Sequence, residues 1–505
     1  MQQTLNRAGG ISLRAVLPEG HFFRGHDIRV SSCVSQAGAC RRGDLFVALV
    51  TLDGDGHDEV GEAVRRGASA ILAERLLPVD VPLCVVPDTR QAYGRLCHKL
   101  AGEPGESLRV VGVTGTHGKT TTSMLIASLV RASGGRGGVL TTLSRSDALE
   151  TQAAVRTTPA PPELAQWLSR MRDNGCSHAV VEASSAGLAE QRLAGLRFDA
   201  LVLTNLRRDH VEHYGSVLTY RQAKARIFTQ LKPHGCAVIN ADDPGSRLAL
   251  AKLDRPVITF GMREEAEIMA EVIERHASEQ TFLLLAGNEA VPVRTRMIGD
   301  HHVYNCLAAA AAGLVMGLEL TAIARGLESL DRLPGRLDRV ECGQPFSVYL
   351  DCADSADRLA VCLKALRRVT RGRVVCVYGN DSEERGGERP LLGRVLEKAA
   401  DLGILTGGSH GCRDTLAAVH DILDGYDRPA RAHVIPSRTQ AIRWALQQAA
   451  PGDTLLIAGS AGEAGGETPD GRGTCQDRET VRTWLYASAR QAEGRPWMVY
   501  PHATQ

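Results

Sequence analysis

The chain has 505 residues, a length at which about three domains are expected, because one domain usually holds ~100–200 residues. Hydrophobic residues make up 43% and charged residues 23%, which excludes a wholly disordered protein. Lys and Arg number 59 against 58 Asp and Glu, giving a formal net charge of +1. Nucleic-acid and membrane-surface proteins need a concentrated positive field, so this balance predicts neither partner.

The sequence also carries no sign of export. No uninterrupted apolar run approaches the ~20 residues that cross a bilayer, and the amino terminus lacks the pattern of a secretory signal. The 13 cysteines are an odd number, scattered singly and without a C-x-x-C pair. This spacing predicts neither a disulfide framework nor a zinc cluster. We therefore expect a cytoplasmic protein with reduced thiols.

Short apolar runs alternate with longer helical patterns along the chain, which predicts an α/β fold with mainly parallel sheets. A helix is expected between the first two strands, another after residue 118, and an alanine-rich one around residues 305–316. The expected strands cover residues 43–50, 67–74, 178–183, 199–206, 236–241, 347–352, 372–380, 401–407 and 453–460. A further strand is expected at the start of RVVGVTGTHGKTTTSMLIASLVRA (109–132), before a glycine turn and an amphipathic helix.

Two stretches rich in Pro and Gly divide the chain into three expected domains. AGEPGESL (101–108) ends the first, and Leu333-Pro334-Gly335 ends the second. The expected domains are residues 1–105, 106–333 and 334–505, and residues from about Ala487 onward are expected to form a loose tail.

A phosphate-binding loop is predicted between a Val-rich strand and a helix. Its residues are Gly115, Thr116, His117, Gly118, Lys119, Thr120 and Thr121. Glycines let the backbone approach phosphate oxygens, and N–H groups at the helix start attract negative charge. Lys119 can neutralise the outer phosphates, and the Thr120 hydroxyl can bind Mg²⁺. The alternative is an ordinary strand–turn–helix junction that contains a lysine.

Polar residues follow the next two predicted strands. Ligand sites of parallel sheets gather at the carboxyl ends of strands, so we expect these residues to converge on the phosphate loop. A carboxylate and an imidazole there are reasonable groups for a magnesium ion that bridges phosphates. A single residue of either kind is more often part of a structural pair. The residues are Glu182, Ser184, Ser185, Thr204, Asn205, Asp209 and His210.

These residues belong to a longer series of motifs that resembles the Mur ligase family, and within it the UDP-N-acetylmuramoyl-tripeptide synthetases. The order and spacing match over roughly residues 43–480. The motifs are TGTHGKTTT (114–122), TTP (157–159), VVEASSAGL (180–188), LTNLRRDHVEHYG (203–215), YRQAKARIF (220–228), NADD (240–243), YNCLAAAAAG (304–313) and PGRLDRV (334–340).

The resemblance implies three domains: a UDP-substrate-binding-like domain, a central P-loop-type ATPase domain with a parallel sheet, and a C-terminal Rossmann-like domain. It also implies an ATP-dependent reaction in which a substrate carboxylate becomes an acyl phosphate and an amine displaces the phosphate. The substrates would be a UDP-linked muramoyl peptide and an amino acid, joined during peptidoglycan synthesis. The implied cofactors are ATP and Mg²⁺. We expect a monomer.

The resemblance also assigns roles to individual residues. Lys119 and Thr120 would hold the ATP phosphates and a magnesium ion, which Glu182 and His210 would also bind. Lys224 matches the lysine that the family carbamylates, although a helix lysine without this motif is usually a solvated charge. Asn305, Arg336 and Asp351 would grip the adenine, the phosphates and the ribose. Contacts with the UDP-linked peptide or the added amino acid fall to Thr157, Thr158, Ser184, Arg192 and Glu463.

Several family motifs are altered in this chain. The Ser-Ser-His of the family is Ser184-Ser185-Ala186, and the Asp-Ser-Arg that holds uridine is Gln36-Ala37-Gly38. In the third domain, Asp-Tyr-Ala-His becomes Asp351-Cys352-Ala353-Asp354. The signature Asp-Asn-Pro-Arg for meso-diaminopimelate is replaced by TGGSHGCRD (406–414), and the final motif is AGSAGE (458–463).

Two interpretations follow. The intact phosphate and metal residues favour a working ATP-dependent ligase with an altered acceptor. The changes in both substrate-binding domains favour a relative that binds nucleotide without ligating and that regulates or scaffolds cell-wall enzymes. Folylpolyglutamate and cyanophycin synthetases share the chemistry but fit the Ser-Ser and T-N-L-x-x-D-H surroundings less well.

Overall fold

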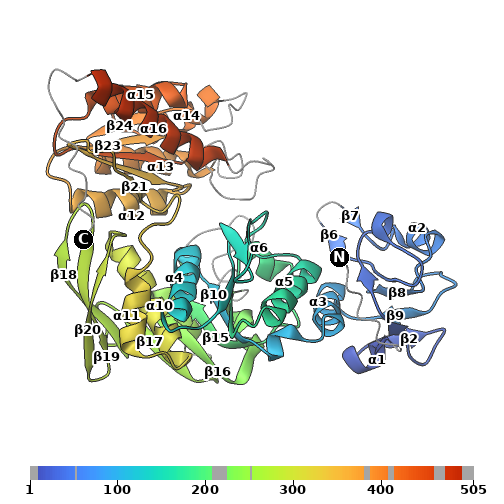
Figure 1. The fold of residues 1–505 in the computed structure, drawn as a ribbon. Helices are drawn as coiled ribbons and strands as arrows, with labels where there is room; N and C mark the ends of the chain where they lie inside the picture. Colours follow the sequence, from blue (N-terminus) through green and yellow to red (C-terminus); the bar gives the residue numbers. More distant parts are fainter. Residues whose placement is uncertain are drawn as a thin grey trace. The chain divides into compact units, whose positions relative to one another are not determined.

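The computed structural model describes residues 10–51, 54–207, 224–250, 253–379, 387–407, 415–459 and 472–491 (Figure 1). The chain forms two compact units. Unit 1 comprises Met1–Gly115, Gly134–Ala237 and Leu248–Val257, and unit 2 comprises Thr116–Ser133, Val238–Arg247 and Ile258–Gln505. Strands and helices alternate along most of the described chain, which confirms the α/β class.

The amino-terminal part of unit 1 is built on a five-stranded sheet with the order β2-β9-β8-β5-β4. Successive residues of β5 point to opposite faces: Leu45 and Val47 join a core with α1 and α3, while Phe46 joins a core with α2. The elements of this part are β1 (Ile11–Ser12), α1 (Leu13–Val16), β2 (His21–Phe23), β3 (Arg29–Val30), β4 (Cys33–Val34), β5 (Leu45–Val47), β6 (Val50–Thr51), β7 (Gly54–Asp55), α2 (Val60–Arg65), β8 (Ala70–Ala73), β9 (Leu83–Val85) and α3 (Thr89–Leu100).

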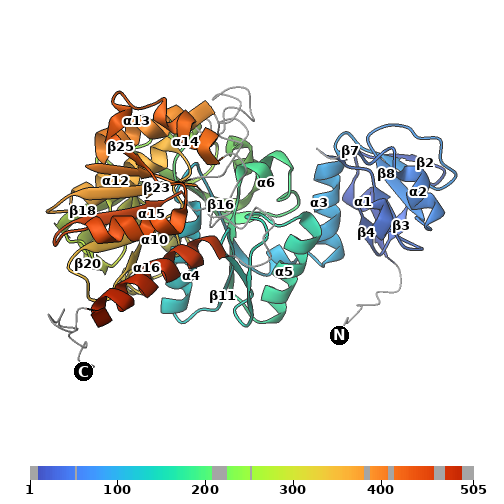
Figure 2. The same cartoon turned by 90° about the horizontal axis from the view of Figure 1, so that it is seen from above.

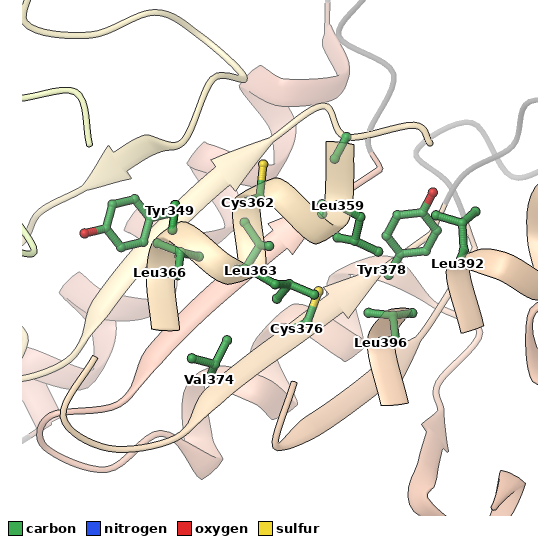
Figure 3. Packing of buried hydrophobic residues seen from close by; sticks show 14 of the residues in the cluster. Tyr349, Leu359, Cys362, Leu363, Leu366, Val374, Cys376, Tyr378, Leu392 and Leu396 are labelled. Carbon is green, nitrogen blue, oxygen red and sulfur yellow. The ribbon is translucent and has the colours of Figure 1, made fainter. Parts of the chain in front are cut away.

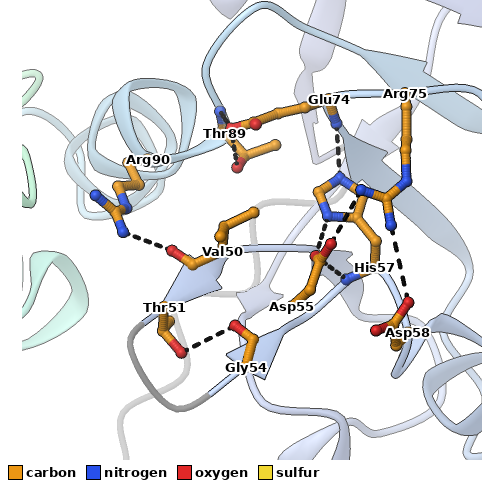
Figure 4. Close-up of polar contacts among 10 residues, drawn as sticks. All are labelled: Val50, Thr51, Gly54, Asp55, His57, Asp58, Glu74, Arg75, Thr89 and Arg90. Carbon is orange, nitrogen blue, oxygen red and sulfur yellow. Dashed lines mark hydrogen bonds and ion pairs between the residues drawn. The ribbon is translucent and has the colours of Figure 1, made fainter.

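A buried histidine ties three segments of this part together (Figure 4). The His57 ring pairs with Asp55 through Nδ1 at 2.5 Å, and its Nε2 accepts the backbone N–H of Glu74 at 3.0 Å. Glu74 in turn accepts the Thr89 hydroxyl at 2.8 Å, at the start of α3. Hydrogen bonds from the backbone and side chain of His57 hold the pKa of Asp55 at about 2. The cluster fixes the chain between β7, β8 and α3.

The second sheet of unit 1 positions most of the predicted site residues. Its strands follow the order β13-β12-β11-β14-β10-β15, and β10 pairs in parallel with both β14 and β15. Val113 lies opposite Glu182 and Thr114 opposite Leu203, so the three strands end at one edge. The elements are β10 (Arg109–Thr114), β11 (Gly137–Leu140), β12 (Ser144–Ser146), β13 (Thr151–Ala153), α5 (Pro161–Asp173), β14 (His178–Glu182), α6 (Ser185–Ala189) and β15 (Phe198–Leu203).

Three helices of unit 2 pack with their backbones unusually close. In α10 (Asp300–Val315), Ala308 through Ala312 are completely buried. A Cβ on Gly326 of α11 (Leu320–Glu328) would lie 2.6 Å from the Cα of Leu129 in α4 (Lys119–Ala132). The Ser128 hydroxyl donates to the Gly326 carbonyl at 2.7 Å. Residues without bulky side chains therefore set the spacing of these helices.

Unit 2 also contains an antiparallel section that the sequence analysis did not identify. β18 (Ile268–Arg275) pairs antiparallel with β19 (Gln280–Ala286), which pairs antiparallel with β20 (Glu289–Thr295). β17 (Val257–Gly261) pairs in parallel with β18. Two further elements, β16 (Leu231–Asn240) and α9 (Pro244–Leu250), carry the chain between the units.

The carboxyl-terminal part of unit 2 has a six-stranded sheet with the order β21-β22-β26-β23-β24-β25, covered by helices on both faces. In β26, Leu456 packs with α12, α13 and α14, and Leu455 packs with α15 and α16. Figure 3 shows the first of these cores, and Figure 2 shows α15 and α16. The elements are β21 (Asp338–Val340), β22 (Ser347–Asp351), α12 (Ala356–Arg367), β23 (Val374–Tyr378), α13 (Arg389–Ala399), β24 (Leu402–Leu405), α14 (Thr415–Leu423), β25 (Ala432–Val434), α15 (Arg438–Gln448), β26 (Thr454–Ala458) and α16 (Arg472–Gln491).

The predicted start of the loose tail, at about Ala487, is too early in the chain. Ala487 lies inside α16, which continues to Gln491. This helix packs Val481 and Leu485 onto the sheet, and that packing extends it beyond the point where the polar composition suggests an end. None of the helices in the described part of the chain is long and apolar enough to span a membrane.

A buried ion pair joins α15 to α16, and we expect its loss to be strongly destabilising. The Arg438 guanidinium binds the Asp477 carboxylate at 2.8 Å, with side-chain exposures of 7% and 5%. Arg438 also donates to the carbonyls of Gly379 and Ala458, which follow β23 and end β26. Arg438→Ala leaves a buried carboxylate unpaired, so it should lower the free energy of unfolding by about 3–5 kcal/mol.

Thermal unfolding followed by circular dichroism would test this expectation. Arg443→Ala, at an exposed position of the same helix, is the control and should shift the melting temperature little. Equal shifts for the two variants would contradict the structural role of the pair.

Buried His302 predicts a loss of stability in mild acid. Burial at the start of α10 lowers its pKa to about 3. The unfolded chain, with an ordinary histidine pKa of about 6.5, therefore binds the proton more readily. Stability should fall as the pH drops from about 6.5 towards 3, by at most about 1.4 kcal/mol per pH unit from this group. In His302→Gln this contribution should disappear, whereas Leu416→Ala, an exposed change that alters no titratable group, should melt with the same pH dependence as the parent. Identical pH slopes in all three proteins would contradict the prediction.

Candidate active site

The phosphate loop begins at Gly115, directly after β10, where only glycine fits. Its φ is +148°, and a Cβ would lie 1.9 Å from Oγ1 of Thr204. The Thr204 hydroxyl donates to the Thr114 carbonyl at 3.3 Å, and the Thr114 hydroxyl donates to Ala183 at 3.0 Å. The ends of β10, β14 and β15 are thus held together where the loop starts, as expected from the sequence.

The second half of the loop precedes α4 in unit 2. Gly118 has a φ of +84°, and a Cβ there would lie 2.2 Å from Oδ1 of Asn305. The N-cap of α4 is Gly118, which has no side chain, and the first N–H groups of the helix point towards the loop. The Lys119 ammonium donates to the Thr116 carbonyl of the loop at 3.0 Å. It thus lies at the loop where ATP phosphates are expected to bind. Thr120 and Thr121 are buried in the first turn, and His117 is half-buried.

Glu182 is the buried carboxylate at the end of β14. One of its oxygens accepts the backbone N–H of Thr142 at 2.9 Å, and the other accepts the Thr142 hydroxyl at 3.1 Å. The same hydroxyl lies 3.0 Å from Oγ1 of Thr157. The sequence analysis missed Thr142. The rule of strand ends could have found it, because Thr141 and Thr142 directly follow β11, a parallel neighbour of β14.

The expected substrate contacts Thr158, Ser184 and Arg192 lie together beside β14. The Thr158 hydroxyl donates to the Glu182 carbonyl at 2.8 Å and lies 3.1 Å from Oγ of Ser184. Arg192 donates to the Thr158 carbonyl at 2.8 Å. Ser184 also caps α6 by accepting the N–H of Gly187 at 3.0 Å. These contacts order a hydroxyl-rich surface next to Glu182.

Lys224 is completely buried, so the alternative of a solvated helix charge is wrong. Its exposure is 1%, and Nζ donates to the carbonyl of Gly115 at 2.9 Å. The structure thus brings Lys224 to the first residue of the phosphate loop, at the edge that carries Glu182.

Comparisons with known proteins match these features to one family. The Mur ligase middle domain matches residues 113–313, and the Mur ligase glutamate ligase domain matches residues 335–461. The UDP-N-acetylmuramoyl-L-alanyl-D-glutamate–2,6-diaminopimelate ligase of Geobacillus kaustophilus is 37% identical over 428 residues, which are 83% of this chain and 88% of that protein. The chain belongs to the Mur ligase family.

Solved structures agree with this assignment. One UDP-N-acetylmuramoyl-L-alanyl-D-glutamate–2,6-diaminopimelate ligase superposes with a TM-score of 0.69 at 27% identity, over 95% of this chain and 99% of the other. The MurF ligase of Thermotoga maritima in complex with ADP superposes with a TM-score of 0.60 at 21% identity, over 91% and 98%. The Mur ligase fold with its three α/β domains is confirmed, while the exact domain boundaries remain predictions.

In the third domain of this Mur ligase, Arg336 and Asp351 lie on adjoining segments. Leu337 donates its backbone N–H to Asp351 Oδ2 at 2.7 Å, and the Asp351 carboxylate is buried at the end of β22. Arg336 is half-buried and reaches the residue after Asp351. Their expected roles towards phosphate and ribose stay predictions. So does that of Asn305, which is buried and also lies 3.5 Å from the Thr122 hydroxyl.

Some of the predicted residues lie outside the described part of the chain. These are His210 with Asp209, Glu463, and most of the altered motif at 408–414. The altered uridine segment is described: Gln36 precedes a short 3₁₀ turn at Ala37–Ala39. Its backbone receives support from Glu59, which accepts the N–H of Ala37 at 3.3 Å. Here the family's charged side chains are replaced by an amide and small residues.

Proposed function

We propose that this Mur ligase is an ATP-dependent amide ligase of peptidoglycan precursor synthesis. It adds an amino acid to UDP-N-acetylmuramoyl-dipeptide in the cytoplasm, as a monomer. The single observation that carries the proposal is the pair of buried groups Glu182 and Lys224 at the sheet edge where the phosphate loop begins. Both groups suit the handling of phosphate charge.

In the proposed reaction, the substrate carboxylate attacks the γ-phosphorus of ATP and ADP leaves. The amine of the incoming amino acid then attacks the acyl phosphate, inorganic phosphate leaves, and the amine loses a proton as the amide forms. Repulsion between the carboxylate and the phosphates is the main obstacle to the first step. Lys119 and the N–H groups at the start of α4 would lower that repulsion by facing the transferred phosphoryl group.

Magnesium fits the residues present. The oxygen donors of Glu182 and Thr120 are the kind that Mg²⁺ prefers, and no group of three His, Cys, Asp or Glu side chains in the described residues forms a dedicated metal cage. Bound there with help from His210, Mg²⁺ would screen the phosphate charge. The Thr142 hydroxyl and N–H orient the Glu182 carboxylate for this role.

Lys224 is proposed to act as a carbamate. The neutral amine adds to carbon dioxide and releases one proton, which changes a cationic side chain into an anionic one. The carbamate keeps an N–H, so the bond to the Gly115 carbonyl is compatible with the modified state. The carbamate oxygens would add negative charge beside a metal ion.

Thr157, Thr158, Ser184 and Arg192 are proposed to bind the UDP-linked muramoyl peptide, with Glu463 near the added amino acid. The hydroxyl-rich surface beside β14 supports this assignment. The relatives' acceptor is 2,6-diaminopimelate, whereas this chain lacks the Asp-Asn-Pro-Arg signature for it. The proposal therefore includes an acceptor that differs from diaminopimelate.

The decisive experiment measures ADP release by the purified protein with ATP, Mg²⁺ and UDP-N-acetylmuramoyl-dipeptide. A panel of amino acids, including diaminopimelate and lysine, is added one at a time, with Lys119→Ala as the control. ADP formation that requires one amino acid, together with a product of the mass of the new amide, supports the ligase and names its acceptor. Nucleotide binding without turnover for any amino acid would instead favour a non-ligating relative.

A further inference from the structure

The chain makes a tight turn between the second and third domains, beside the end of β22. Gly335 and Leu337 both have positive φ values, +66° and +45°, and Arg336 lies between them. The turn is held by two hydrogen bonds: the Leu337 N–H donates to the Asp351 carboxylate at 2.7 Å, and the Cys352 N–H donates to the Gly335 carbonyl at 3.1 Å. A non-glycine residue in the left-handed region is costly, and such strain persists where the surroundings enforce it. The backbone of Arg336 is therefore fixed.

The side chain of Arg336 contacts a buried cysteine. Cys352 is buried, with 4% exposure, and its thiol donates to the Gly335 carbonyl at 3.1 Å. The Arg336 guanidinium contacts this sulfur through Nη1, which also donates to the Gly335 carbonyl at 3.0 Å. A second guanidinium, that of Arg358, donates to the same sulfur at 3.1 Å. Sulfur can accept both bonds while its hydrogen is used by the carbonyl.

A carboxylate completes the arrangement. Asp354 binds Arg358 at 2.9 Å, and the two side chains are 26% and 17% exposed. Asp354 lies just before α12, and Arg358 lies in its first turn. The described contacts thus link Asp354 to Arg358, Arg358 to Cys352, and Cys352 to Arg336.

Two of these contacting residues, Cys352 and Asp354, are departures from the family motif. The family's Asp-Tyr-Ala-His is Asp351-Cys352-Ala353-Asp354 in this protein. A phenol ring at position 352 would occupy the space in which the two guanidinium groups meet the sulfur. A cationic or neutral imidazole at position 354 could not supply the carboxylate that holds Arg358. The replacements at positions 352 and 354 are therefore structurally linked, because Asp354 binds the arginine that contacts Cys352.

We propose that Cys352 is a positioning residue that holds the Arg336 guanidinium for a nucleotide phosphate, with Asp354 supporting it through Arg358. The inference rests on the proposed function, because it assumes that Arg336 contacts ATP. An unrestrained arginine samples many rotamers, and fixing it before binding removes that entropic cost from the binding step. The altered motif is then a rebuilt nucleotide site.

The test is calorimetric binding of a non-hydrolysable ATP analogue with Mg²⁺ to the full-length protein. Arg336→Ala should weaken binding about tenfold or more, as for the loss of a charged hydrogen bond to phosphate. Cys352→Ala should weaken it roughly 3- to 10-fold, whereas Cys352→Ser, which keeps a donor and an acceptor, should bind nearly as tightly as the parent. In the Arg336→Ala background, Cys352→Ala should have no further effect, since its action passes through Arg336.

Steady-state kinetics supply a readout that a purely structural role would not move. Cys352→Ala should raise the KM for ATP while leaving the KM for the acceptor amino acid unchanged. If Cys352→Ala folds poorly, Arg358→Met and Asp354→Asn can replace it, because both keep the cysteine. Each should also weaken nucleotide binding. Their melting temperatures must equal that of the parent for the comparison to be valid.

The outcomes separate the inference from the proposed function. Nucleotide binding that is equal in the parent and in Cys352→Ala overturns the inference alone. So does an effect of Cys352→Ala that adds fully to that of Arg336→Ala, or an Arg336→Ala variant that binds as the parent does. A parent protein that does not bind the nucleotide overturns both.

Discussion

Lys119→Ala is expected to remove ATP-dependent amide formation almost completely, with kcat/KM reduced on the order of 1000-fold or more. Lys119 begins α4, and its ammonium already lies over the loop carbonyl of Thr116 at 3.0 Å. A γ-phosphate on this loop would replace that weak partner with a charged one. The N–H groups of the helix start would remain in the variant, but fixed dipoles carry less charge than an ammonium.

ADP release and product mass would be measured for the parent and three variants. Lys119→Arg tests whether a positive charge alone is enough for activity. This variant should recover little activity, because the planar guanidinium is larger than an ammonium and directs its hydrogen bonds differently. Lys364→Ala, at an exposed position on α12, is the matched control and should retain full activity. Full activity of Lys119→Ala would show that the phosphate site has been assigned to the wrong residues.

Lys224→Ala is expected to be nearly inactive, with a loss on the order of 100- to 1000-fold. The buried Nζ donates to the Gly115 carbonyl at the loop start, and a carbamate there would place an anion where a metal ion is expected. Added formate or acetate should restore part of the activity by entering the space that the side chain leaves. Parent activity should also fall when carbon dioxide and bicarbonate are removed from the buffer.

Lys224→Arg separates charge from modification. Arginine keeps the cation but forms no carbamate under these conditions, so this variant should be as inactive as Lys224→Ala and should not respond to bicarbonate. Mass spectrometry of the intact parent under a carbon dioxide atmosphere provides an independent measurement. Turnover that does not change in Lys224→Ala would remove this residue from the mechanism.

The sequence was most informative where function follows from local pattern. The strand, glycine turn and helix around Gly115 and Lys119 were predicted together, and so was the convergence of Glu182 and Thr204 on that turn. Both predictions rest on short-range spacing and on the geometry of parallel sheets. The same rule, applied to one more strand, would have added Thr142.

Long-range contacts could not be predicted in this way. Nothing in the local sequence pairs Arg438 with Asp477, or brings Arg358 to Cys352. The antiparallel strands β18 to β20 were missed because charged residues interrupt their alternation and because Ile273, an apolar residue, is exposed. Ala487 was placed in a tail because the packing of α16 on the sheet is visible only in three dimensions.

The close backbone packing of α4, α10 and α11 has a consequence for motion and for tolerance to mutation. At Gly326, the space that a single methyl group would need is already filled by the Cα of Leu129, so this seam should tolerate few substitutions although it takes no part in chemistry. Helices joined so tightly move as one body, and their central amides should be among the last to exchange with deuterium. The second half of the phosphate loop, which leads into α4, is therefore expected to have a rigid base.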